Sequence, residues 1–283
     1  MPSSLPATLT WPQRLAASAR TCGHCLCLGL DPDPSRLPEP SDNPLEGCRK
    51  LVHDLLDELE RHHLSPAAFK PNLAYFERFG SRGLAWLEEL LPRLRDRAPV
   101  ILDAKRGDIG PSSQAYADAV FDTWQGDAVT VSPWMGRDSL QPFLDRCPER
   151  GVYVLLHTSN PGASDLQHPR LQGGLSAWKH LQGLLSGPWY RPGLGAVVGA
   201  TRPEALAEVV EELGQLSFPL LIPGVGSQGG EAQTVLRALG KSAPLARVNV
   251  SSGILYAFEK DKRPAALAGA EAFRRFSEGL KLT

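Results

Sequence analysis

The sequence predicts an α/β protein built as a single (β/α)8 TIM barrel, and three observations support this. Eight short apolar runs, each the length of a buried strand, recur along the 283 residues. Amphipathic helical stretches alternate with these runs, and about 250 residues is typical of eight strand–helix units. Polar side chains and glycines follow the runs, where a barrel would bring them to one face. A doubly wound open sheet is the alternative, because alternation alone does not show that a sheet closes.

The predicted strands share a run of apolar residues that stops near a polar side chain or a glycine. In chain order they are Cys25–Leu30, Ala67–Lys70, Val100–Ala104, Ala128–Val131, Val152–Leu156, Ala196–Gly199, Leu220–Pro223 and Arg247–Val250. Leu51, Leu55 and Leu59 mark the apolar face of one intervening helix. The segment from Thr201 to Glu204 predicts a capping box at the start of another.

The chain is expected to form one domain over residues 1–283, because no Gly/Ser-rich linker divides it. Residues 160–195 are predicted to be an insertion after the fifth strand, over the catalytic end of the barrel, with a helix at about 175–185. The N-terminus lacks a basic start followed by an apolar core, so it does not resemble a signal peptide.

Composition excludes several classes of partner. Thirty basic and 31 acidic residues give a net charge of −1, which favours neither nucleic acid nor a membrane surface. No run of 18 apolar residues predicts a membrane span. Five cysteines, an odd number, do not suit a disulfide framework, so we expect a cytoplasmic protein in a reducing compartment.

Charged residues gather where the third strand ends. Asp103 and Lys105 are two residues apart and so point to the same face of a strand, and Asp108 follows just beyond. Lys70 ends the second strand and Asp31 follows the first, so a barrel would bring all five to one site. Perturbed titratable groups gather at active sites, although a structural ion-pair network at the barrel rim is the alternative.

The glycines after the seventh strand predict a phosphate site. Gly224, Gly226 and Gly229 fit the pattern G-x-G-x-x-G, but no acidic residue stands near position 245 to bind the ribose of a dinucleotide. In this place in a barrel, the backbone amides of such a loop bind phosphate. A plain flexible turn is the alternative. No His or Cys residues have the spacing of metal ligands.

These motifs resemble the orotidine 5′-phosphate decarboxylase family, in its bacterial type 2 branch. The matching segments follow the family's order between about Leu28 and Tyr256. They are Phe69-Lys70-Pro71-Asn72, Asp103-Ala104-Lys105-Arg106-Gly107-Asp108-Ile109-Gly110, Thr158-Ser159-Asn160-Pro161-Gly162, Val198-Gly199-Ala200-Thr201 and Pro223-Gly224-Val225-Gly226-Ser227-Gln228-Gly229-Gly230.

The resemblance implies decarboxylation of orotidine 5′-phosphate to UMP, the last step of de novo UMP biosynthesis, with no metal and no organic cofactor. It implies a homodimer with shared active sites. Lys105 would protonate C6 of the pyrimidine, with Asp103 beside the departing carboxylate. Lys70 would join the ribose to the charge network, and Asp108 would come from the neighbouring subunit. The implied substrate-binding residues are Asp31, Ile109, Ser112, Ser159, Pro223, Gly226, Gln228, Gly229, Ser251 and Ser252.

One departure from the family concerns the phosphate. The family often has an arginine after the eighth strand, where this chain has Ser251-Ser252-Gly253, and Arg202 is a candidate replacement. Two other functions remain open. A sugar-phosphate lyase of the same barrel suprafamily would need Mg²⁺ and an acidic residue in place of Lys70. A non-catalytic barrel that binds phosphometabolites would not need the complete set of lysines and aspartates.

Overall fold

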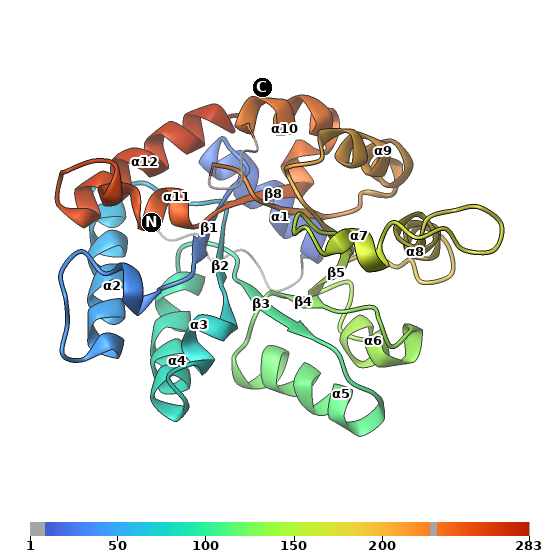
Figure 1. Ribbon diagram of the computed structural model, residues 1–283, viewed down its shortest axis with the longest axis horizontal. Helices are drawn as coiled ribbons and strands as arrows, with labels where there is room; N and C mark the ends of the chain where they lie inside the picture. The colour runs from blue at the N-terminus through green and yellow to red at the C-terminus, as the bar shows by residue number, and fades with distance from the viewer. Residues whose placement is uncertain (1–8, 227–230, 283) are drawn as a thin grey trace.

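The computed structural model describes residues 9–226 and 231–282, and its eight strands alternate with helices around a central barrel (Figure 1). The strands are β1 Leu26–Leu30, β2 Ala68–Pro71, β3 Ile101–Arg106, β4 Ala128–Val131, β5 Gly151–His157, β6 Leu194–Val198, β7 Leu220–Pro223 and β8 Ala246–Val250. The α-helices are α1 Trp11–Cys22, α2 Pro44–Arg61, α3 Leu73–Glu77, α4 Ser81–Arg95, α5 Gly110–Asp118, α6 Arg137–Leu144, α7 Ala163–Leu166, α8 Ala177–Ser186, α9 Pro203–Leu213, α10 Ala232–Leu239, α11 Ser252–Leu255 and α12 Ala265–Gly279.

The sheet runs in the order β2-β1-β8-β7-β6-β5-β4-β3, and the pairs within it are parallel. Two isolated parallel bridges, Phe69 to Val100 and Asn72 to Asp103, join its two outer strands. The predicted (β/α)8 barrel is therefore confirmed, in place of an open sheet. All eight predicted strands are present, with ends that differ from the prediction by at most two residues.

The barrel interior is filled by side chains from alternate strand positions, because successive strand residues point to opposite faces. Seven strands each contribute one residue to a buried apolar cluster. They are Cys27, Ala68, Ile101, Ala128, Tyr153, Val197 and Leu221. The residues between them, such as Leu26 and Leu28 of β1, face outward into a second core against the helices.

Helix α1, which was not predicted, closes the N-terminal end of the barrel. Trp11 and Leu15 belong to the interior cluster, and the indole of Trp11 meets the ring of Tyr153 edge-on at 6.2 Å. The fully buried guanidinium of Arg247, in β8, donates a hydrogen bond to the carbonyl oxygen of Leu15 at 2.6 Å. Thr10 and Gln13, joined by a 2.9 Å bond from the Thr10 amide to Gln13 Oε1, are a sequence signal for this helix.

The predicted capping box at Thr201 is wrong. Helix α9 begins at Pro203 with Arg202 at its N-cap and no side-chain cap hydrogen bond. A box at Thr201 would put Pro203 second in the helix. Proline favours the first position of a helix, because its fixed φ suits the helix and the N–H that it lacks would have no hydrogen-bond partner there. The helix therefore begins one residue later, at Pro203.

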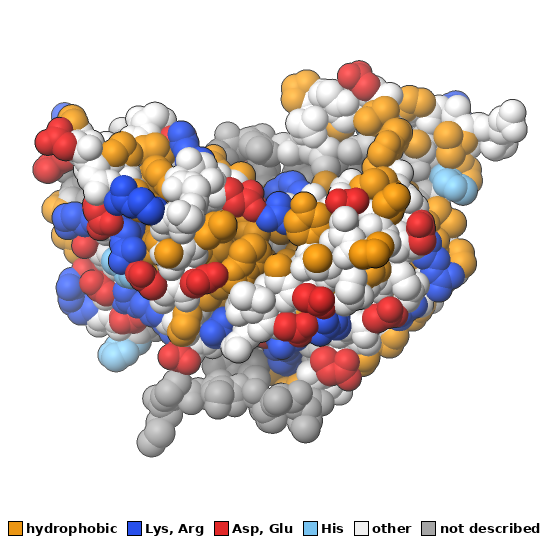
Figure 2. All heavy atoms as spheres, turned by 90° about the horizontal axis from the view of Figure 1, so that it is seen from below, with side chains coloured by type: hydrophobic (Ala, Val, Ile, Leu, Met, Phe, Trp, Pro, Cys, Tyr) orange, Lys and Arg blue, Asp and Glu red, His pale blue; other side chains and the backbone are white. Residues whose placement is uncertain are grey.

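The segment between β5 and β6 carries α7 and α8 and extends outward to the right of the barrel in Figure 1. Figure 2 shows acidic and basic side chains interspersed over one side of the molecule, with no large area of a single sign. Among the helices of residues 9–226 and 231–282, none is both long enough and apolar enough to cross a bilayer.

Candidate active site

The two-residue strand period that fills the barrel also places polar side chains above its core. Two positions after the interior residues Ala68 and Ile101 stand Lys70 and Asp103, and Asp31 follows Cys27 by four. These side chains line a cavity of about 390 Å³ at the carboxyl ends of the strands. The cavity is lined by Asp31, Asp33, Arg36, Lys70, Asn72, Tyr75, Asp103, Lys105, Pro223, Gly224, Val225, Asn249, Ser251, Ser252 and Tyr256.

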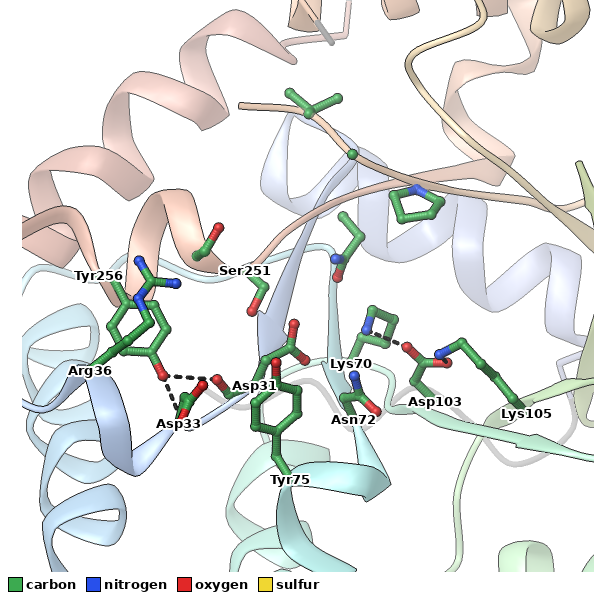
Figure 3. A pocket seen from close by; sticks show the side chains of 15 residues that line it. Asp31, Asp33, Arg36, Lys70, Asn72, Tyr75, Asp103, Lys105, Ser251 and Tyr256 are labelled. Atoms are coloured by element: carbon green, nitrogen blue, oxygen red, sulfur yellow. Dashed lines mark hydrogen bonds and ion pairs between the residues drawn. The ribbon is translucent and has the colours of Figure 1, made fainter. Parts of the chain in front are cut away.

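Asp103 lies between two ammonium groups on one side of this cavity (Figure 3). Lys70 Nζ donates to Asp103 Oδ2 at 2.7 Å, and Lys105 Nζ donates to Asp103 Oδ1 at 2.6 Å. Lys70 and Asp103 are buried, whereas the Lys105 side chain is 49% exposed. A buried carboxylate that is bonded through both oxygens keeps its charge, and the more exposed ammonium is the one that can reach a ligand.

The pKa values of the buried pair move in opposite directions. Burial alone would raise the pKa of Asp103, but the charges of Lys70 and Lys105 hold it well below its ordinary value. Burial alone would lower the pKa of Lys70, but the charges of Asp103 and Asp31 raise it above its ordinary value. Both groups are therefore charged at neutral pH.

The part of the cavity wall formed by the ends of β1 and β8 offers unpaired polar atoms. Asp31 Oδ1, Asn249 Oδ1 and Ser251 Oγ are buried and have no hydrogen-bond partner among the described residues. The hydroxyl of Tyr256 donates to the carbonyl oxygen of Asp31 at 2.9 Å and fixes the end of β1. Buried polar atoms without partners are rare, so these three are suited to bind a polar ligand such as a sugar.

Gly29 allows β1 and β8 to approach closely at this wall. A Cβ atom on Gly29 would lie 2.6 Å from Ser251 Cβ and 2.9 Å from Asn249 Oδ1. Any larger residue would push these two side chains out of the cavity wall. The sequence of β1 therefore sets the position of polar groups that β8 supplies.

A second cavity of about 600 Å³ shares Arg36, Ser252 and Tyr256 with the first. Gly226 lines it, together with Arg275 of α12, whose neighbour Phe276 packs under Gly226. Arg36 is already paired with Glu259 at 2.6 Å, whereas no ion pair joins Arg275 to an acidic side chain among the described residues. A basic side chain is thus available beside the glycine loop.

The structure brings together some of the residues predicted for the site. Those that line the first cavity are Asp31, Lys70, Asp103, Lys105, Pro223, Ser251 and Ser252. Gly226 lines the second cavity. Gln228 and Gly229 lie outside the described residues. Arg202, at the N-cap of α9, lines neither cavity.

Four predicted residues do not line the cavities of their own chain. Asp108 is half-buried, and its Oδ1 accepts a hydrogen bond from the amide of Ile109 at 2.8 Å. Ile109 and Ser112 are exposed around the start of α5. Ser159 follows β5 and packs against Gly199. The expectation from residue spacing, that one chain would gather Asp108 with the other four charges, is therefore not met within a single chain.

Sequence reasoning missed several cavity residues, including Asn72, Tyr75 and Asn249. It also missed Thr130, whose hydroxyl donates to Asp103 Oδ1 at 2.8 Å. A signal was present in two of these cases. Asn249 and Thr130 are polar residues within short apolar runs, each two positions after a fully buried strand residue, Arg247 and Ala128. In residues 9–226 and 231–282, no three His, Cys, Asp or Glu side chains group as a metal site would require.

Comparison with known proteins shows the family to which the chain belongs. Residues 24–267 match the family described as Orotidine 5'-phosphate decarboxylase / HUMPS family. The chain is 42% identical to an orotidine 5'-phosphate decarboxylase of Roseiflexus sp. over 94% of its own length and 96% of that protein. It is 44% identical to one of Methylibium petroleiphilum, over 90% and 95% of the two chains.

A solved structure with a related sequence has the same fold as this chain. The crystal structure of a putative orotidine 5'-phosphate decarboxylase from Streptomyces avermitilis has a TM-score of 0.79 with this chain at 33% identity. The match covers 98% of this chain and 96% of that one. By sequence and by fold, the chain belongs to the orotidine 5'-phosphate decarboxylase / HUMPS family.

Proposed function

We propose that this protein decarboxylates orotidine 5′-phosphate to UMP, the last step of de novo UMP biosynthesis. One observation carries the proposal: Asp103 is buried between the ammonium groups of Lys70 and Lys105 at the wall of a cavity large enough for a nucleotide. The two bacterial relatives named above, over 40% identical, carry the name of this enzyme.

Lys105 is the group that we assign to proton transfer. When the bond between C6 and the carboxylate breaks, its electron pair stays on C6 and CO₂ leaves. C6 then takes a proton from Lys105 Nζ, which becomes a neutral amine until solvent reprotonates it. A fixed ammonium beside C6 stabilises negative charge that exists only as the reaction proceeds, which is the condition for raising the rate.

Asp103 has two roles in this proposal. It holds the Lys105 ammonium at 2.6 Å, so that the proton donor is in place before the substrate binds. It also lies beside the substrate carboxylate, where repulsion between two anions is relieved as CO₂ leaves. Lys70 offsets the remaining charge of the buried carboxylate and reaches toward the ribose.

We propose that the reaction needs no metal and no organic cofactor. Both oxygens of Asp103 already accept hydrogen bonds, from Lys70, Lys105 and Thr130. A divalent ion at this carboxylate would lie beside two ammonium groups, whose positive charges repel it. A sugar-phosphate lyase that uses Mg²⁺ is therefore the less suitable function for this arrangement.

The remaining cavity residues would bind the rest of the nucleotide. Asp31 would accept hydrogen bonds from ribose hydroxyls through its unpaired buried oxygen. The phosphate would lie over the glycine loop, with Gln228 and adjacent backbone amides around it, and Arg275 of the second cavity would supply the positive charge. Ser159 would bind the edge of the pyrimidine. The other proposed substrate contacts are Pro223, Gly226, Gly229, Ser251 and Ser252.

We further propose a homodimer whose active sites are shared. Asp108, Ile109 and Ser112 do not line the cavity of their own chain and would instead complete the site of a neighbouring one. Large apolar side chains are exposed around this segment: Ile109 is 57% exposed, and Met135, which lies against Gly107, is 41% exposed. The five cysteines, all free thiols, suit the reducing cytoplasm, where we place the enzyme.

The test is a spectrophotometric assay with orotidine 5′-phosphate, with and without EDTA. We expect turnover to UMP and CO₂, at the same rate after the enzyme is dialysed against EDTA. Loss of activity in EDTA that Mg²⁺ restores would favour the metal-dependent lyase. Tight binding of UMP without any release of CO₂ would favour a non-catalytic phosphometabolite-binding barrel.

A further inference from the structure

The hydroxyl of Thr130 links the backbone of Lys105 to the carboxylate of Asp103. Thr130 lies in β4 and is 1% exposed. Its Oγ1 accepts a hydrogen bond from the Lys105 amide at 3.0 Å and donates to Asp103 Oδ1 at 2.8 Å. The direction of both bonds is fixed, because a backbone amide only donates and an ionised carboxylate only accepts. The single hydroxyl proton must therefore point at Asp103.

The backbone of Lys105 needs such support. Its φ is +47°, in the left-handed region that residues other than glycine adopt only at a cost in free energy. The pairing of β3 with β4 shifts here, since Leu102 pairs with Val129 and Arg106 pairs with Val131. Three residues of β3 thus stand opposite Thr130 alone, and the bond to the Thr130 hydroxyl gives the Lys105 amide a partner at this bulge.

This bulge sets the direction of the Lys105 side chain. In a regular strand, Lys105 would continue upward from Asp103 on the same face, about 7 Å away at the backbone. In the left-handed conformation its Nζ instead lies 2.6 Å from Asp103 Oδ1, the same oxygen that accepts the Thr130 proton. The Lys105 side chain is half-exposed, so little else among its surroundings confines it.

We propose that Thr130 is a positioning residue for Lys105. It holds the left-handed backbone of Lys105 and one oxygen of Asp103, and so keeps the ammonium aimed into the cavity. The proposal rests on the function proposed above, in which Lys105 delivers a proton. Thr130 itself does not line the cavity and would not touch the substrate.

The test compares Thr130→Val, which has nearly the same volume without the hydroxyl, with Thr130→Ser, which keeps the hydroxyl. Displacing a catalytic group by about 1 Å can lower the rate on the order of 100-fold. We expect Thr130→Val to lower kcat by about this factor, with KM for orotidine 5′-phosphate and affinity for UMP unchanged. Thr130→Ser should keep most of the wild-type kcat. A merely structural role would not lower kcat while KM and the affinity for UMP stay unchanged.

Ser18→Ala is the matched control, because Ser18 Oγ donates to the carbonyl oxygen of Ala67 at 2.7 Å from a buried position in α1, at the opposite end of the barrel. This variant should lose thermal stability and keep its kcat. Thr130→Ala is made in parallel, so that the comparison with Thr130→Ser survives if Thr130→Val does not fold. A wild-type kcat without the hydroxyl, or a serine variant as slow as the alanine variant, overturns the proposal.

Crystal structures separate this proposal from the proposed reaction. In Thr130→Val or Thr130→Ala, φ of Lys105 should leave the left-handed region and Nζ should move away from Asp103. An unchanged Lys105 in both variants contradicts the positioning role, even if the wild-type protein releases no CO₂. Absence of CO₂ release by the wild-type protein contradicts the proposed function alone.

Discussion

Asp103 accepts hydrogen bonds from two ammonium groups and one hydroxyl while it is buried at the wall of the cavity. Removing one partner of a buried ion pair costs about 3–5 kcal/mol, because it leaves an uncompensated charge. The same contacts set the charge states of the site. At the scale of the residue, stability and the proposed chemistry therefore depend on the same carboxylate.

The depressed pKa of Asp103 predicts how stability depends on pH. A carboxyl whose folded pKa lies below its unfolded value of about 3.8 stabilises the fold above that pH. This contribution is lost as the pH falls through the folded pKa, because the native carboxylate is then protonated as well. We expect wild type to be more stable than Asp103→Asn at pH 7, with a gap that narrows below about pH 3.8.

Urea unfolding of both proteins at pH 7, 4.5 and 3 measures this gap. Asp54→Asn is a suitable control, since Asp54 pairs with Lys50 on the exposed face of α2. The free energy of unfolding of Asp54→Asn should be close to that of wild type at all three pH values. A gap between wild type and Asp103→Asn that is the same at pH 3 and pH 7 would show that the buried pair does not lower the pKa of Asp103.

At the scale of the element, the sequence predicted strands better than helix ends. Each strand is a short apolar run with a polar residue or glycine beyond it, and these signals are local. Helix α1 was missed because its apolar side chains, Trp11 and Leu15, pack into the far end of the barrel. This long-range contact cannot be read from the local sequence. The left-handed Lys105 was also unpredictable, since it depends on Thr130, a residue 25 positions away.

Asp108 and Ile109 lie between β3 and α5, and Ser112 lies in the first turn of α5. None of the three lines the cavity of its own chain. If Asp108 serves the neighbouring subunit, then Lys105→Ala in one chain and Asp108→Ala in the other both fall in the same site of a mixed dimer. One site of each hybrid carries both defects and the other carries neither. Random pairing in a symmetric dimer then restores about one quarter of wild-type activity from two inactive variants.

Co-expression of the two variants with different purification tags tests this expectation. Each variant alone should be inactive, and the doubly purified hybrid should be active. A hybrid with no more activity than its parents contradicts the shared site. Asp138→Ala, at an acidic residue in the first turn of α6, is a control that should remain active on its own.

At the scale of the whole molecule, barrel closure converts distant sequence positions into one cavity. Residues in or just after β1, β2, β3, β7 and β8 line this cavity. The two-residue period of strands that carry the interior core places Lys70 and Asp103 among them. The sequence could predict this meeting of charges because parallel strands end on the same face. The sequence could not predict which residues contact a second chain, because an exposed apolar residue in one chain does not show what packs against it.

The central claim is that the Lys105 ammonium, held by Asp103, delivers the proton that completes decarboxylation. The most direct measurement is the rate of CO₂ release from orotidine 5′-phosphate by Lys105→Ala, taken together with its affinity for UMP. The account predicts no measurable turnover and UMP binding close to that of wild type. Substantial residual decarboxylation by a variant that still binds UMP would contradict it.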